Sequence, residues 1–269
     1  MVKEIPFWNG EDLCDKTIII NPEREIDVIM FARFVIEISK KSKQVIFRCF
    51  ENLYKLMKTN MPSNVKVVKM RDNVAADFQV MILSIPYFLK TTSENLPTFH
   101  IKPNVKEMEK TKYLFDGKVN KIGFCFSKGG EGSIRSINEI EKKQAFEMAY
   151  KQAFDSDKYS FFSLNHEEIS SKNITDLSNF IYEYDKLASV ISHLDLLISF
   201  DNSVAHIASS MNKETWILTK KMSGWRLVEN NKKDGCLWYP NTKIIKIDDN
   251  TSIESVFDKI NYMIEKKFQ

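Results

Sequence analysis

The chain has 269 residues, which is enough for two domains of ordinary size or one large one. With 43% hydrophobic and 28% charged residues its composition is that of a soluble globular protein, and a formal net charge of +3 gives no reason to expect nucleic-acid binding. Four widely spaced cysteines without a CxxC pair argue against a zinc site and favour a reducing compartment. The first residues are too polar for a signal peptide and no apolar run approaches membrane-spanning length, so we expect a cytoplasmic protein without an integral membrane segment.

The first part of the sequence alternates between short apolar runs and helical patterns. The expected strands are 17–21, 44–50, 65–69 and 78–83, and the expected helices are 27–39 and 51–58, with a short turn or helix at 85–89. Alternation at this spacing predicts a parallel sheet with right-handed crossovers.

The segment 91–118 differs from its neighbours because it carries two prolines and many polar residues around a short helical patch. It is typical of a connection between two domains, which we therefore place at 1–118 and 119–269. The α/β pattern then resumes, with expected strands at 121–126, 159–164, 194–200, 215–218 and 243–247 and expected helices at 139–154, 185–192 and 253–266. These patterns predict two similar α/β domains that face each other across a cleft.

The stretch 194–218 is the most informative part of the sequence. A buried strand ends at Asp201-Asn202-Ser203, a helical pattern with His206 in its first turn follows, and a second apolar run begins at Thr215. Asn202 or Ser203 can cap the helix, whose free backbone N–H groups favour an anion at the carboxyl end of the strand. An ordinary strand–turn–helix unit without a ligand is the alternative interpretation.

Four blocks of the sequence occur in an order and spacing that match a known enzyme family. They are 8–13 with 27–34, 121–123 with 134–137, 194–208, and Gly224-Trp225-Arg226 with Leu237-Trp238-Tyr239-Pro240. The last two blocks together are specific. On these residues the chain resembles the family-nine glycosyltransferases, heptosyltransferase-like enzymes of the GT-B fold that include relatives fused to tetratricopeptide repeats.

The resemblance implies a fold and a reaction. The fold is α/β, with two Rossmann-like domains whose parallel sheets face each other across a cleft, the first holding mostly the acceptor and the second mostly the donor. The reaction is an inverting transfer, without metal or other cofactor, of a sugar from a nucleotide-diphosphate sugar to a hydroxyl of a glycan, lipopolysaccharide, lipid-linked or protein acceptor. It requires a base for the acceptor proton, donors for the departing diphosphate, and a cleft that aligns both partners.

The resemblance also assigns roles to individual residues. Asp27 takes the position of the family's catalytic base, although its spacing alone favours a helix cap. Lys128 and Arg135, in the glycine-bearing loop 127–136, are candidates to bind the diphosphate, and arginine offers a fork of donors suited to phosphate. A mobile connector is the other interpretation of this loop. Asp201, Asn202, Ser203 and His206 complete the expected donor site, and Asn165, Trp225 and Arg226 are expected to line the cleft.

The chain departs from the family most strongly before Asp27. The family has a Gly-Leu-Gly turn there, whereas this chain has Arg24-Glu25-Ile26, and β-branched Ile26 disfavours a positive φ. Two functions therefore stay open: a glycosyltransferase, and a catalytically degenerate nucleotide-sugar binding or scaffold protein of the same fold. An epimerase or dehydrogenase would need a GxGxxG turn after the first strand, and residues 20–28 contain no glycine.

Overall fold

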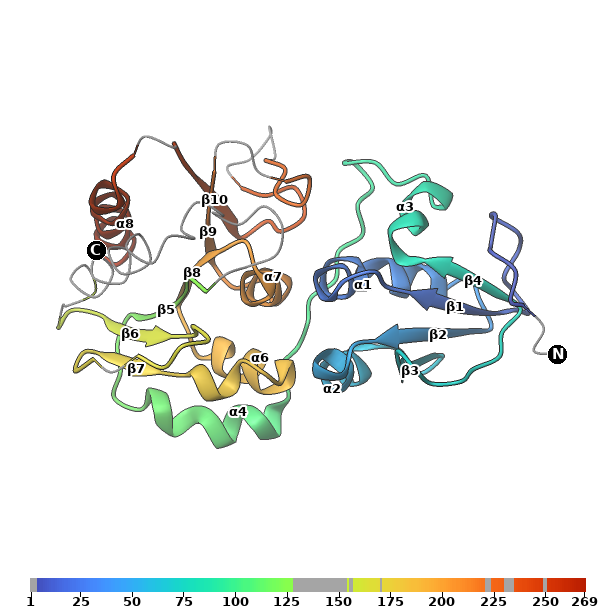
Figure 1. The fold of residues 1–269 in the computed structure, drawn as a ribbon, viewed down its shortest axis with the longest axis horizontal. Helices are drawn as coiled ribbons and strands as arrows, with labels where there is room; N and C mark the ends of the chain where they lie inside the picture. The colour runs from blue at the N-terminus through green and yellow to red at the C-terminus, as the bar shows by residue number, and fades with distance from the viewer. Residues whose placement is uncertain are drawn as a thin grey trace.

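The computed structural model describes residues 4–127, 154, 157–169, 171–220, 224–229, 235–248 and 251–269. These residues form two parallel sheets, and each sheet is built from one contiguous part of the chain (Figure 1). The predicted helix 139–154 and the candidate residues Lys128 and Arg135 lie outside the described residues. No helix within the described ranges is both long and apolar enough to span a membrane.

The first sheet has the order β3-β2-β1-β4, and all of its pairings are parallel, as predicted. Its strands are β1 (Thr17–Asn21), β2 (Gln44–Cys49), β3 (Val65–Lys69) and β4 (Phe78–Met81). Helices α1 (Glu25–Ser39) and α2 (Glu51–Asn60) follow the first two strands, and α3 (Ile85–Phe88) follows a 3-10 turn at Ile82–Ser84. Residues 18–20 of β1 are all isoleucine and all buried, which is typical of a parallel strand that is covered on both faces.

The second sheet has the order β10-β9-β8-β5-β6-β7, again with every pairing parallel. Its strands are β5 (Lys121–Cys125), β6 (Ser160–Ser163), β7 (Ile174–Asp176), β8 (Leu196–Phe200), β9 (Thr215–Lys220) and β10 (Thr242–Ile247). If β5 to β10 are renumbered 1 to 6, the order from the β7 edge is 3-2-1-4-5-6. This is the doubly wound order of dinucleotide-binding sheets. The strand order therefore reverses between β5 and β8.

Helices cover both faces of the second sheet. They are α4 (Val105–Thr111), α6 (Tyr184–Ser192), α7 (Ser203–Ser210) and α8 (Ile253–Lys267), with 3-10 turns at Lys112–Phe115 and Ser178–Phe180. α4 packs against α6, and the Phe115 ring lies 4.6 Å from the Phe162 ring and 4.8 Å from that of His193. The later part of the predicted connection 91–118 thus packs with the second half, while the strands of the two sheets fall on either side of residue 118.

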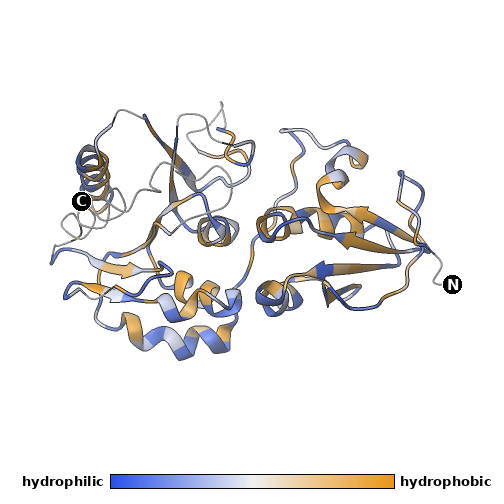
Figure 2. Ribbon diagram, viewed as in Figure 1, coloured by the Kyte–Doolittle hydropathy of each residue, from blue (hydrophilic) through white to orange (hydrophobic). Residues whose placement is uncertain are grey.

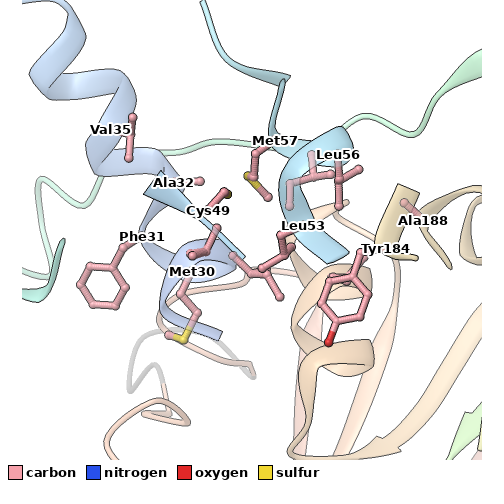
Figure 3. Packing of buried hydrophobic residues seen from close by; sticks show 14 of the residues in the cluster. Met30, Phe31, Ala32, Val35, Cys49, Leu53, Leu56, Met57, Tyr184 and Ala188 are labelled. Atoms are coloured by element: carbon pink, nitrogen blue, oxygen red, sulfur yellow. The ribbon is translucent and has the colours of Figure 1, made fainter. Parts of the chain in front are cut away.

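The two halves share a hydrophobic core where their helices meet. α1 packs against α7, and α2 packs against α6. Figure 3 shows Leu53 of the first half beside Tyr184 of the second. Met30, Leu53, Tyr184 and Ala188 all belong to one cluster of buried residues. Apolar segments also run along the strands of both sheets (Figure 2). Where these helices meet, side chains fill the space between the two halves.

Arg33 of α1 donates hydrogen bonds to three different segments of the chain. Its guanidinium donates to the carbonyl oxygens of Met30, Pro97 and Trp238, at 3.0, 3.1 and 3.1 Å. The group also lies 5.8 Å from the centre of the Trp238 ring. Helix α1, the connecting segment and a loop of the second half are thereby held at one point.

Candidate active site

A cavity of about 330 Å³ lies between the two halves. Its described lining comprises Glu25 and Asn52 from the first half and Cys125, Ser127, His166, Ile181, Tyr182, Tyr184, Asn202, Ser203 and Val204 from the second. Cys125 ends β5, and Asn202 follows β8 by two residues. The cavity is therefore at the carboxyl ends of the two strands between which the sheet order reverses, the place where doubly wound sheets bind ligands.

Asn202 directs the start of α7 toward this cavity. Its Oδ1 accepts the backbone N–H of Ala205 at 3.1 Å, so Asn202, one of the two predicted caps, is the N-cap of the helix. Its Nδ2 lies 3.4 Å from the sulfur of Cys125, which joins the ends of β5 and β8. Asn202 and Ser203 thus bring the first turn of an eight-residue helix to the cavity wall, and its N–H groups carry partial positive charge.

Asp201 and His206 lie behind the cavity. His206 is completely buried, with Nε2 2.9 Å from Asp201 Oδ1 and Nδ1 3.0 Å from the Tyr239 hydroxyl. Neither Asp201 nor His206 is among the lining residues. Of the residues predicted for the donor site, Asn202 and Ser203 line the cavity, while Asp201 and His206 support the turn that carries them.

Asn165 also has a supporting position. It is 5% exposed, and its Oδ1 accepts the backbone N–H of Phe126 at 2.6 Å. Ser127 Oγ accepts the backbone N–H of His166 at 2.7 Å. These bonds hold together the loops that follow β5 and β6, and His166, next to the predicted Asn165, is the residue that lines the cavity.

The structure brings Asp27 and Arg226 together from opposite halves. Asp27 Oδ1 accepts from Arg226 Nη2 at 2.6 Å, and the Asp27 side chain is 0% exposed. The Arg226 guanidinium lies 4.3 Å from the centre of the Trp225 ring, which is about half exposed. Of the two residues predicted to line the cleft, Arg226 therefore covers the predicted base, and Trp225 lies against the Arg226 guanidinium.

The interpretation of Asp27 as a helix cap is wrong. α1 begins at Glu25, its N-cap is Arg24, and no side chain caps it by a hydrogen bond. Asp27 is the third residue of the helix, and its Oδ2 is a buried atom without a hydrogen-bond partner in the described part of the chain. Its carboxylate is engaged by an arginine 199 positions away in the sequence.

Glu25 is a site residue that the sequence did not assign. Its Oε1 accepts from Asn52 Nδ2 at 2.9 Å, and its Oε2 accepts from the Tyr184 hydroxyl at 2.7 Å. Burial raises the pKa of Tyr184, so the phenol stays protonated and donates. Its signal in the sequence is the Arg24-Glu25-Ile26 turn, which stands where the family has Gly-Leu-Gly.

The described lining of the cavity contains one carboxylate, Glu25, and neither lysine nor arginine. The cations predicted to bind the diphosphate, Lys128 and Arg135, are outside the described ranges. Within those ranges no group of three or more histidine, cysteine, aspartate or glutamate side chains is placed to hold a metal ion.

Comparison with solved structures shows which fold this is. E. coli ADP-heptose lps heptosyltransferase II matches with a TM-score of 0.58 at 10% identity, over 94% of this chain and 100% of its own. A family 9 glycosyl transferase from Veillonella parvula matches with a TM-score of 0.57 at 11% identity, over 96% and 97%. E. coli heptosyltransferase WaaC with ADP-2-deoxy-2-fluoro heptose matches with a TM-score of 0.56 at 8% identity, over 93% and 99%.

These likenesses extend over nearly the whole chain, so the α/β fold with two parallel sheets is that of the GT-B heptosyltransferases. No protein-family model matches the sequence, and no curated protein matches it. At identities of 8–11% the match concerns the fold, and the activity has to be argued from the site.

Proposed function

We propose that this chain is an inverting, metal-independent glycosyltransferase that moves a sugar from a nucleotide-diphosphate sugar to an acceptor hydroxyl. The observation that carries the proposal is the cavity between the halves, at the strand ends where the second sheet reverses its order and beside the first turn of α7. Two structures of the same fold were determined with sugar nucleotides, one with ADP-2-deoxy-2-fluoro heptose and one with ADP-D-beta-D-heptose.

The chemistry of this transfer fits the parts of the site. The acceptor oxygen attacks the anomeric carbon, its proton passes to a base, and the bond to the nucleotide diphosphate breaks with the electron pair staying on the leaving oxygen. The N–H groups at the start of α7, together with the predicted cations Lys128 and Arg135, would stabilise the charge on the diphosphate. Such donors can take the place of a metal ion in neutralising a leaving diphosphate.

The acceptor would approach from the first half, where the start of α1 faces the cavity through Glu25. A hydroxyl of a glycan, lipopolysaccharide, lipid-linked or protein acceptor meets the chemical requirement. Both halves contribute to the cavity wall, so donor and acceptor would be held in line by groups from different halves.

A thermal-shift screen tests the donor. ADP, GDP and UDP and their sugars are each added to the protein in the presence of EDTA, and we expect one base family to raise the melting temperature, because a ligand that binds only the folded state stabilises it. The absence of a shift with every nucleotide would contradict the proposal.

A matched pair of variants tests where the nucleotide of the donor binds. Ser203→Glu puts a carboxylate into the first turn of α7 at the cavity, and Ser255→Glu puts one into the first turn of α8, which is remote from it. The first change should abolish the nucleotide shift by repelling the diphosphate, and the second should leave it intact. Equal shifts in both variants would place the nucleotide elsewhere.

A second candidate function is a catalytically degenerate nucleotide-sugar binding or scaffold protein. The buried ion pair between Asp27 and Arg226 favours it, because the predicted base is covered in this structure. Donor binding without release of nucleotide diphosphate, in water and with a panel of acceptors, would support this candidate over the transferase.

A further inference from the structure

Two carboxylates lie in the first turn of α1, and their surroundings differ. Asp27 is fully buried, bonded to Arg226 and covered from the opposite half. An acceptor hydroxyl has to come within about 3 Å of its base. Asp27 is not among the described residues that line the cavity between the halves.

Glu25 faces the cavity instead. It is partly exposed, it lines the wall opposite Asn202 and Ser203, and it is the one carboxylate in the described lining. The predicted donor position at the start of α7 and the Glu25 side chain therefore border the same space.

The hydrogen bonds that Glu25 accepts from described residues orient its carboxylate. Asn52 and Tyr184 are neutral donors, and each binds a different carboxylate oxygen. A carboxylate offers about four lone-pair sites, and within the described part of the chain each Glu25 oxygen accepts one side-chain hydrogen bond. Asp27, in contrast, accepts from an arginine cation at 2.6 Å, which blocks access to its Oδ1.

Other lining groups are less suited to take a proton. The Tyr184 phenol has a pKa raised by burial and already donates to Glu25. The Cys125 thiol is 1% exposed, and burial raises its pKa to about 11. His166 is exposed, with its ring 5.8 Å from that of Tyr182, and it is the competitor that an experiment has to address.

We propose that Glu25 is the catalytic base of the transfer, in place of Asp27, which has a structural role in the contact between the halves. This inference rests on the proposed glycosyltransferase function. As the acceptor oxygen bonds to the anomeric carbon, its proton moves to a Glu25 oxygen and the nucleotide diphosphate departs with the electron pair of the broken bond.

The test uses the full chain with ADP-heptose, ADP-glucose, UDP-glucose and GDP-mannose as donors and water as the acceptor. Release of nucleotide diphosphate is measured for the wild type and for Glu25→Gln, Asp27→Asn and His166→Gln, each checked for folding by circular dichroism. We expect Glu25→Gln to lower the maximal rate by about 100-fold or more, the range for loss of a general base, with an unchanged donor-induced thermal shift. Asp27→Asn and His166→Gln should each lower the maximal rate less than Glu25→Gln does.

The pH profile supplies a second readout. A general base makes the maximal rate fall toward acid pH, and Glu25→Gln should remove that fall while Glu25→Asp keeps it at a reduced rate. A merely structural role of Glu25 would lower the rate without changing the shape of the profile, and that result overturns the proposal.

Three further outcomes also overturn it. Loss of turnover in Asp27→Asn with retention in Glu25→Gln would return the role to Asp27 and require the ion pair to open, and the same pattern in His166→Gln would give the role to His166. A wild type that shows a donor-induced shift but releases no nucleotide diphosphate, in water and with the panel of acceptors, removes the base and the transfer together. A wild type without any donor shift is distinct from these results, because it rejects the donor site itself.

Discussion

The ion pair between Asp27 and Arg226 joins residues from opposite halves at a point where both are shielded from water. Asp27 is 0% exposed and the Arg226 side chain is 15% exposed. Removing one partner of a buried pair leaves an uncompensated charge in a poorly solvated place, whereas an exposed pair contributes little. The stability of the molecule should therefore depend on this pair far more than on a surface pair.

Arg226→Met is expected to lower the free energy of unfolding by about 3–5 kcal/mol, because it strands the buried Asp27 carboxylate. Urea denaturation followed by circular dichroism measures it. Lys40→Met is the control: it removes the exposed pair with Glu37 and should cost at most about 1 kcal/mol. The double variant Asp27→Leu, Arg226→Met should lose less than Arg226→Met alone, and a larger loss would contradict the stranded charge as the cause.

Sequence reasoning placed some of these residues and missed others for a geometric reason. The cap at Asn202 was predictable because it depends on three neighbouring residues and a helix start. The different surroundings of Glu25 and Asp27 were not predictable from the sequence. Residues two apart on a helix point about 200° apart, and the sequence does not say which side of α1 the other half covers. Arg226, which covers Asp27, is remote in the sequence.

Strand β5 is the central element of the second sheet, paired with β6 on one side and β8 on the other. Gly123 lies in its middle, and a Cβ added there would lie 2.4 Å from a methyl carbon of Leu194 and 3.0 Å from one of Leu164. Leu194 and Leu164 are both fully buried, so they have little room to move away.

Gly123→Ala should lower the free energy of unfolding by about 1–3 kcal/mol through overpacking. Gly224→Ala is the matched control, since a Cβ at that position would meet nothing within 4 Å. Chemical denaturation of both variants compares them, and equal stabilities would show that the leucines around β5 repack freely.

Helix α4 is anchored to the second half through His193, whose Nε2 lies 3.1 Å from the Met108 carbonyl oxygen and 3.2 Å from the Thr111 hydroxyl. Burial, followed by the charges of Lys213 and Lys121, lowers the pKa of His193 below its ordinary value of 6.5. The unfolded chain therefore takes up this proton before the folded protein does as the pH falls.

The contribution of His193 to stability is then complete above about pH 6.5 and decreases as the pH falls below that value, until the folded protein is protonated as well. Unfolding free energies of the wild type and of His193→Gln, measured at pH 7.5 and pH 5.5, check this. The wild type should lose more stability between the two values than the variant, and an equal loss would exclude His193 as the cause.

At the scale of elements, most strands were predictable because buried parallel strands are continuous apolar runs. Strands β1 and β3 have their predicted bounds, and β5, β8 and β10 differ by one or two residues at an end. Strand β7 was missed because Ile174–Asp176 contains three residues, of which one is buried and apolar. Such a short edge strand carries no periodicity.

For the whole molecule, the relation between the two halves was the least predictable feature. The resemblance implied sheets facing across a cleft, and the fold comparison confirms that architecture. The apolar core between α1, α2, α6 and α7 was not predicted. An amphipathic pattern shows that a helix buries one face, but it does not say whether the burial is against its own sheet or against another half.

Because the halves share this core, we expect them to unfold together. Urea curves from far-ultraviolet circular dichroism and from tryptophan fluorescence should coincide with one midpoint, since Trp8 reports on the first half and Trp216 on the second. Leu53→Ala, at the centre of the shared core, should move both curves equally, whereas Leu83→Ala, at a partly exposed position, should move neither appreciably. Two separate midpoints would mean that each half is stable alone.

Each sheet is built from an uninterrupted stretch of chain, and the wall of the cavity takes residues from both stretches. The cavity is in this sense a binding interface between two partners that share one tether, and the tether sets a high effective concentration for their docking. Substitutions in the shared core would then alter the fraction of molecules in which the cavity is complete, so that a residue far from the reacting atoms can lower ligand affinity without touching the ligand.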